Sequence, residues 1–204
     1  IKLVKVCEKI VGIFILFLGF DMSGVNVAMI KELGAKMTLK DHDFYITHPF
    51  DQNRKIYLKP DDVHNVKNQT WGLKNHNIRL QQDFVTKYDL SSTLCTFNEI
   101  KKVFNAQKDC DFKLCKKLTS KVINPSQFDK MRENVVKEVF SVSVIEAIDK
   151  IHQDNPKRNS TAFILECLNK YYHISTNRTG WSIEKFDEYE NDIKFLQFMI
   201  DEFY

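Results

Sequence analysis

The feature that most constrains the fold is an unbroken apolar run at residues 10–20, which ends abruptly at Asp21. The run is far shorter than the roughly 20 residues that a membrane-spanning helix needs, so we predict no membrane association. An acidic residue directly after it also argues against a signal peptide. Residues 13–20 are bulky and often β-branched or aromatic, which is typical of a central strand covered on both faces. Asp21 is then expected at the carboxyl end of this strand, where functional residues of open α/β sheets gather.

Glycines and small polar residues mark the ends of two helices around this strand. Residues 1–9 have the apolar spacing of a short helix, and Gly12 is expected to break it. After the strand, Ser23 or Asn26 is expected to cap a second helix that Gly34 ends. The expected order of elements is therefore helix, strand, helix.

Two further strands are predicted at residues 44–47 and 55–59, with a turn-rich segment between them. Asp61 and His64 follow the second of these strands, at the start of the next helix. Because they follow a strand end, as Asp21 does, we expect all three side chains on one rim of the sheet. A hydrogen-bonded turn that fixes the strand exit is the simpler role for Asp61 and His64.

Beyond about residue 75, strand signals vanish and helical periodicity takes over. In the long helix expected after Pro125, the apolar stripe is predicted to include Phe128, Met131 and Val135. The predicted helices cover residues 97–106, residues 112–118, one long stretch after Pro125, residues 160–172 and residues 181–204. We therefore predict a mixed α/β fold in which a small α/β unit precedes a mainly α-helical region.

The charge of the chain is nearly balanced, with 30 Lys and Arg against 27 Asp and Glu and a formal net charge of +3. This balance neither demands nor excludes a nucleic-acid partner. One basic cluster does stand out, at Lys101, Lys102, Lys108, Lys113, Lys116, Lys117 and Lys121. A solvated helix face explains it most simply, and contact with DNA or phosphate is the alternative.

The five cysteines are widely scattered and include no CxxC pair. An odd number without the spacing of a zinc site predicts reduced thiols inside the cell.

Three segments together resemble the P-element transposase family, which includes the THAP-type relatives. The first is FDMSGVNVAMIKELG at residues 20–34, and the second is HPFDQNRKIYLKPDDVHNVKN at residues 48–68. The third, KLTSKVINPSQFDKMRENVVKEVFSVSVIEAI at residues 117–148, is similar to the start of a helical domain inserted in the family's catalytic core. The resemblance implies a partial RNase-H-like core at residues 1–75 and a helical, GTP-binding-type insertion domain at residues 76–204.

The resemblance gives Asp21 a catalytic role as a metal ligand. Its counterpart in the family is one of three acidic residues that hold two Mg²⁺ ions for phosphodiester chemistry. We expect that four further residues do not bind the metal themselves. They either hold its ligands in place or have a purely structural role, and they are Asn26, Asp61, His64 and Lys67.

The other two family carboxylates have no counterpart here, since they are expected before Ile1 and beyond Tyr204. The chain, which begins with Ile1, is therefore expected to be an internal fragment that does not cleave DNA alone. The resemblance implies a nuclear parent protein that acts on transposon-end DNA, with a homo-oligomer as a further expectation. The competing hypothesis is a domesticated, non-catalytic module that binds DNA or protein.

GTP is the second ligand that the resemblance suggests. The family's phosphate-facing Lys falls at Asn134 and its guanine-reading Asp falls at about His173. A neutral His cannot supply the two acceptors that a carboxylate offers to guanine, and no GxxxxGK[ST] motif is present. The candidate nucleotide-binding residues are Lys130, Arg132, Asn134, Lys137, His173 and Asn177.

Overall fold

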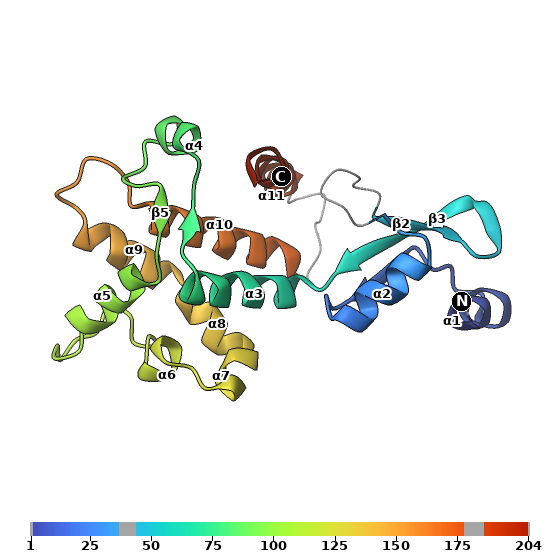
Figure 1. Ribbon diagram of the computed structural model, residues 1–204, viewed down its shortest axis with the longest axis horizontal. Helices are drawn as coiled ribbons and strands as arrows, with labels where there is room; N and C mark the ends of the chain where they lie inside the picture. Colours follow the sequence, from blue (N-terminus) through green and yellow to red (C-terminus); the bar gives the residue numbers. More distant parts are fainter. Residues whose placement is uncertain (1, 37–43, 178–185, 204) are drawn as a thin grey trace. The chain divides into compact units, whose positions relative to one another are not determined.

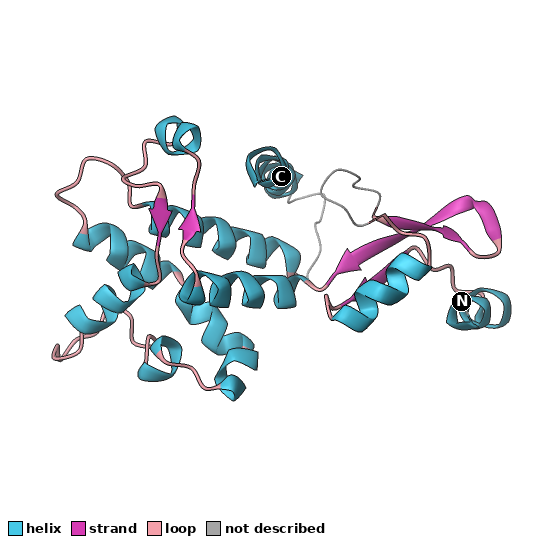
Figure 2. Ribbon diagram, in the orientation of Figure 1, coloured by secondary structure: helices cyan, strands magenta, loops and turns pink. Residues whose placement is uncertain are grey.

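The computed structural model describes residues 2–36, 44–177 and 186–203. The chain forms two compact units, Ile1–Asn65 and Val66–Tyr204, and each is treated below by itself. The division falls inside helix α3 (Asp62–Asn75), whereas the sequence analysis placed a boundary at the end of this helix. Figure 1 gives the element labels, and Figure 2 shows strands in the first unit and mostly helices in the second.

The first unit contains a three-stranded sheet of β1 (Phe17–Phe20), β2 (Tyr45–His48) and β3 (Asp51–Pro60). The strand order is β1-β3-β2, with β1 parallel and β2 antiparallel to the central β3. The predicted turn-rich segment is therefore too long, because β3 already begins at Asp51. An irregularity between Thr47 and His48 accommodates this early return of the chain.

Strand β1 differs most from its prediction. Only the last four residues of the apolar run are in the strand, and β1 lies at an edge of the described sheet rather than at its centre. As a result its surroundings are open: Phe14 is 72% exposed and Phe17 is 63% exposed. The run is apolar enough for a fully covered strand, but in the described part of the chain β3 alone pairs with it.

The helices of the first unit follow the predicted order. They are α1 (Lys2–Lys5), the π-helical turn η1 (Val6–Val11) and α2 (Gly24–Glu32). Gly12 and Gly34 end the helical segments with φ of 76° and 91°, a left-handed conformation that glycine adopts without strain. A small core forms where Ile30 of α2 packs against the inward residues of the sheet. Its other buried members are Phe20, Ala35, Ile46, Ile56 and Leu58.

The second unit is built mainly from helices around a larger core. Its elements after α3 are β4 (Ile78–Arg79), α4 (Gln82–Lys87), β5 (Leu94–Cys95), α5 (Asn98–Ala106), α6 (Ser120–Ile123), α7 (Gln127–Met131), α8 (Glu133–Val139), α9 (Val142–Ile151), α10 (Ser160–Ser175) and α11 (Phe186–Phe203). The pair β4 and β5 is antiparallel and was not predicted. No helix in the described part of the chain is long and apolar enough to cross a bilayer.

The single long helix predicted after Pro125 is wrong. The chain forms α7, α8 and α9 instead, because the backbone is extended at Arg132 and again at Ser141. A capping box between Ser126 and Asp129 starts α7. The apolar stripe is correspondingly interrupted: Phe128 and Met131 are 80% and 73% exposed, whereas Val135 is buried.

The helix predicted at residues 112–118 is also absent, and the side chain of Gln107 explains why. Its amide nitrogen donates to the carbonyl of Cys115 at 3.1 Å, and its amide oxygen accepts from the Cys115 N–H at 2.9 Å. Both backbone groups of Cys115 are therefore satisfied by a side chain, and the segment stays a loop. Phe112 is left 93% exposed in this loop.

The apolar spacing in residues 181–204 predicts Ile193, Leu196 and Ile200 on the inward face of helix α11, but the structure turns a different face inward. Ile193 and Ile200 are 45% and 55% exposed, whereas Phe198 contacts the ring of Tyr88 at 5.8 Å. Ring contacts therefore decide its orientation more than aliphatic spacing does. Trp181, at the predicted start of this helix, lies outside the described residues.

Candidate functional site

Asp21 directly follows β1 at the carboxyl end of the sheet. Phe20 of β1 is in register with Pro60 of β3, and the N–H of Asp61 donates to the carbonyl of Phe20 at 2.7 Å. Asp21 and Asp61 thus follow two neighbouring parallel strands, as expected from the sequence. This end of the sheet is where the first unit gathers its predicted site residues.

The Asp21 carboxylate is held by the first turn of α2. Its Oδ1 accepts from the Ser23 N–H at 2.9 Å and from the side-chain amide of Asn26 at 2.7 Å. Hydrogen bonding from the Ser23 side chain is the largest cause that lowers the pKa of Asp21, followed by the Ser23 backbone and Asn26. Asp21 is therefore an ionised, oriented carboxylate at neutral pH, and a hard cation prefers such an oxygen ligand.

Asp61 and His64 form a helix start beside Asp21. Asp61 Oδ1 accepts from the N–H groups of Val63 and His64 at 2.9 Å and 3.2 Å, which caps α3. The His64 ring nitrogen Nε2 lies 3.9 Å from Asp61 Oδ2, a distance for electrostatic attraction rather than a hydrogen bond. His64 is also near enough to Asp21 to contribute, as the smallest cause, to its lowered pKa.

The described residues do not complete a metal centre. Among residues 2–36, 44–177 and 186–203, no three His, Cys, Asp or Glu side chains are grouped so that they could hold an ion. Asp21 fits one position of a Mg²⁺ site by its chemistry, but one carboxylate does not make a two-metal site.

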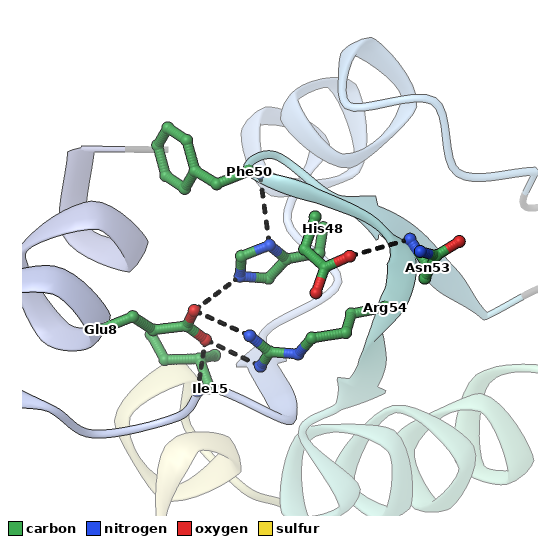
Figure 3. Close-up of polar contacts among 7 residues, drawn as sticks. Glu8, Ile15, His48, Phe50, Asn53 and Arg54 are labelled. Atoms are coloured by element: carbon green, nitrogen blue, oxygen red, sulfur yellow. Dashed lines mark hydrogen bonds and ion pairs between the residues drawn. The ribbon is translucent and has the colours of Figure 1, made fainter.

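A polar cluster that the sequence did not predict lies elsewhere in the first unit (Figure 3). Glu8 of η1 accepts two hydrogen bonds from Arg54 of β3, both at 2.9 Å, and one from the Ile15 N–H at 2.9 Å. The buried ring of His48 places its Nε2 at 3.0 Å from Glu8, and its Nδ1 accepts from the Phe50 N–H. The Phe50 bond leaves the proton of a neutral ring on Nε2, which lies near Glu8 but makes no hydrogen bond among the described residues.

These contacts lower the pKa of Glu8 to about 2, with the Arg54 hydrogen bond as the largest cause. The cluster joins η1 to the β2–β3 hairpin and explains why His48 of the second resembling segment is buried. Glu8 and Arg54 lie 46 residues apart, so no local spacing could have revealed their pairing. We assign the cluster a structural role.

In the second unit, two of the predicted nucleotide-binding residues surround Tyr172. Lys137 Nζ lies 3.1 Å from Glu133 and 4.6 Å from the centre of the Tyr172 ring, and the Tyr172 hydroxyl donates to Glu133. The His173 ring is 5.9 Å from that of Tyr172. Glu133 and Tyr172 were missed as site members, although the spacing of Glu133 and Lys137 is that of a helical ion pair.

This ion pair affects the charge that Lys137 offers. Hydrogen bonds from Tyr172 and then from Lys137 lower the pKa of Glu133, and Lys67 adds a smaller electrostatic contribution. The pKa of Lys137 is raised, first by Tyr172 and also by Glu133. Lys137 is thus fully charged but already paired with a carboxylate, which makes it a weaker phosphate ligand than a free lysine.

The other predicted nucleotide-binding residues are more dispersed. Lys130 lies in α7, where its backbone carbonyl accepts from the Trp71 indole at 3.0 Å. Arg132 joins α7 to α8, Asn134 is exposed in the first turn of α8, and Asn177 follows the end of α10. The structure therefore brings Lys137 and His173 near one aromatic ring without forming a recognisable phosphate cradle among the described residues.

The elements described above define the fold class of the chain. A small mixed sheet followed by a mainly helical region confirms the predicted mixed α/β fold class. Among solved structures, this chain is similar to the Drosophila P element transposase strand transfer complex, with a TM-score of 0.74 and 17% sequence identity. The similarity covers 98% of this chain and 45% of the other, so this chain spans less than half of that protein's length. No family model and no curated protein matches the sequence.

The chain therefore has a P-element-transposase-like fold. At 17% identity this similarity concerns the fold alone.

Proposed function

We propose that this chain is part of a P-element-type DNA transposase and that Asp21 supplies one metal-binding carboxylate of its catalytic centre. The observation that carries the proposal is the placement of Asp21 at the end of β1, where Asn26 and Ser23 hold it as an ionised oxygen ligand. The fold similarity supports the same proposal, since it covers nearly the whole chain.

In this proposal the described residues hold and orient the Asp21 carboxylate, but they do not complete the catalytic centre. Asn26 directs its amide toward Asp21, and Asp61 fixes the start of α3 beside it. These are positioning residues, because their hydrogen bonds are made to protein groups. The remaining metal ligands are proposed to come from other segments of a parent protein that acts on DNA in the nucleus.

The decisive experiment measures Mg²⁺- or Mn²⁺-dependent cleavage of transposon-end DNA by the full-length parent protein. Asp21→Asn keeps the shape and the acceptor oxygen but removes the charge, so we expect cleavage to be lost while folding is intact. Asn26→Ala is expected to reduce cleavage by about 10–100-fold, the usual effect of losing a partner of a metal ligand. Asp83→Asn, at an exposed position of α4, is the matched control.

The same measurement separates a second candidate, a non-catalytic module that binds DNA or protein. Both candidates agree with the lack of a three-ligand group in the described part of the chain, so cleavage by the parent protein is what distinguishes them. Full cleavage activity in Asp21→Asn would contradict the metal-ligand role. A well-folded parent without any cleavage activity would favour the interaction module.

GTP binding by α8 and α10 stays a prediction. The pairing of Lys137 with Glu133 weighs against it, as does the replacement of a guanine-reading carboxylate by His173. Equilibrium titration of the chain with a fluorescent GTP analogue tests it directly. Saturable binding that Lys137→Ala removes would support a nucleotide site.

A further inference from the structure

The second unit contains an apolar cavity between α5 and α9 that none of the predicted functions uses. Its volume is about 250 Å³, and its lining includes Val103 and Ala106 of α5 and Ala147 and Ile151 of α9. The loop after α5 completes the cavity with Phe112 and Leu114. Pockets that enclose drug-sized ligands are usually larger, about 300–1,000 Å³, so this cavity suits one or two side chains.

Three of the large apolar side chains at this cavity are unusually exposed. Phe112 is 93% exposed, Leu114 is 67% exposed and Ile151 is 43% exposed. Exposed apolar groups gathered around a concavity mark interaction sites more often than scattered single residues do. The loop that carries two of them is tied in place by the Gln107–Cys115 hydrogen bonds, so the lining is held by the fold.

The cavity has a modest excess of positive charge. Lys150 is part of its lining, and the loop at residues 107–116 carries Lys108, Lys113 and Lys116 against Asp109 and Asp111. Within the part of the chain that the structure describes, these four lysines make no ion pair, unlike Lys102, which pairs with Glu99. Unpaired lysines around an apolar cavity are complementary to a partner that is acidic outside and apolar at its centre.

The lining favours a peptide over a nucleic acid. Reading a base requires polar groups directed at its edges, and the one side-chain amide in the lining, that of Gln107, is already used by Cys115. Phosphate contacts alone would leave the apolar cavity empty. A bulky apolar side chain from a peptide removes this surface from water, at roughly 25 cal/mol per Å² of apolar area.

We propose that the α5–α9 cavity is a docking site for an acidic peptide segment that inserts a bulky apolar side chain between Ala106 and Ile151. The surrounding lysines contact the acidic residues on either side of that anchor. The site lies within the second unit and depends on neither Asp21 nor a metal.

The test selects binders of the 204-residue chain from a displayed library of random peptides and then measures the affinity of a selected synthetic peptide. We expect the selected sequences to combine Asp or Glu with Leu, Phe or Trp. Ala106→Phe fills the cavity from an exposed position and is expected to weaken binding at least tenfold. Leu114→Ser, at a solvent-exposed loop position, is expected to weaken it as well without affecting folding.

Charge variants give a second, independent readout. Lys150→Glu is expected to weaken binding by about three- to tenfold, an effect that falls as salt screens the exposed charges. Lys31→Glu, on α2 of the first unit, is the matched control and should leave the affinity unchanged. Circular dichroism establishes that each variant is folded.

Several other outcomes would contradict the docking proposal. Selected peptides without acidic residues, or peptides that bind the folded Ala106→Phe and Leu114→Ser variants as tightly as the original chain, would overturn the proposal. A library that yields no binder specific for the original chain would also overturn it. Binding of duplex DNA that needs Lys150 but ignores Ala106→Phe would assign the surface to nucleic acid instead.

Discussion

The two units of this chain differ in how completely their apolar side chains are buried. In the second unit, Val139, Val144 and Leu165 are completely buried, and the helices around them share one large core. In the first unit, the core is small, and Phe14 and Phe17 of the apolar run are mostly exposed. An apolar sequence therefore does not by itself produce a buried element, because burial also requires neighbours that cover it.

The largest expected effect that tests this contrast is the loss of a central side chain of the second unit. Leu165→Ala should reduce the free energy of unfolding of that unit by about 2–5 kcal/mol, because a cavity replaces a fully buried side chain. Trp71 and Trp181 both belong to residues 66–204, so tryptophan fluorescence during urea unfolding reports this unit. Leu16→Ala, at a 57% exposed position of the first unit, is the control, and hydrogen exchange of the β1 and β3 amides measures its stability. Equal losses in both variants would break the comparison.

The cap of helix α10 tests the same comparison through a smaller expected loss of stability. Asn159 Oδ1 accepts from the N–H groups of Thr161 and Ala162 at 2.9 Å and 3.3 Å, at the start of the central helix α10. Asn159→Ala should cost about 0.5–2 kcal/mol in the same urea experiment. Asn155→Ala, which removes an exposed loop contact to the Lys157 N–H, is expected to cost less. The reverse order would mean that the cap does not stabilise α10.

The first unit is expected to respond to acid through Glu8. Its pKa is lowered to about 2 from an ordinary value of 4.5, so the folded state favours the ionised form. The resulting stabilisation is complete above about pH 4.5 and is lost as the pH falls toward 2. Glu8→Gln should therefore lower stability at neutral pH and flatten its dependence on pH in this window. Hydrogen exchange of β2 and β3 amides provides the measurement, and an unchanged pH profile would contradict the assignment.

The smallest expected effect on stability is at the exposed ring of Phe17. Phe17→Ser should change the free energy of unfolding by no more than about 0.5 kcal/mol, because the side chain is mostly in water. The same change should reduce binding of a dye that reports exposed apolar surface. Phe20→Ser, at a 7% exposed position of the same strand, is the matched contrast and should be strongly destabilising. A large loss from Phe17→Ser would show that this ring is covered in solution.

Local signals account for what the sequence predicted correctly. Ser23 and Gly34 mark the ends of α2, and the apolar run that ends at Asp21 places this residue after a strand. The shared rim of Asp21 and Asp61 could also be predicted, because both residues follow strands that the sequence identifies. These features depend on neighbours within a few positions along the chain.

What could not be predicted depends on distant partners. The pairing of Ile78 with Cys95 uses strands of two residues, which are too short to show a periodicity. The loop at residues 112–118 has a helical pattern that the side chain of Gln107 overrides. The extended backbone at Arg132 likewise divides a stretch whose apolar spacing favours one long helix.

The Glu8–Arg54 contact has a consequence for the order in which the first unit folds. The β2–β3 hairpin joins residues that are close in sequence, so it can form early and without help from the amino-terminal segment. The η1 contact closes a chain segment of 46 residues, and β1 must find β3 over a similar distance. Longer loops cost more entropy to close, so η1 and β1 are expected to dock last, onto a hairpin that already exists. During synthesis, the first part of this unit to leave the ribosome would thus be among the last to reach its place.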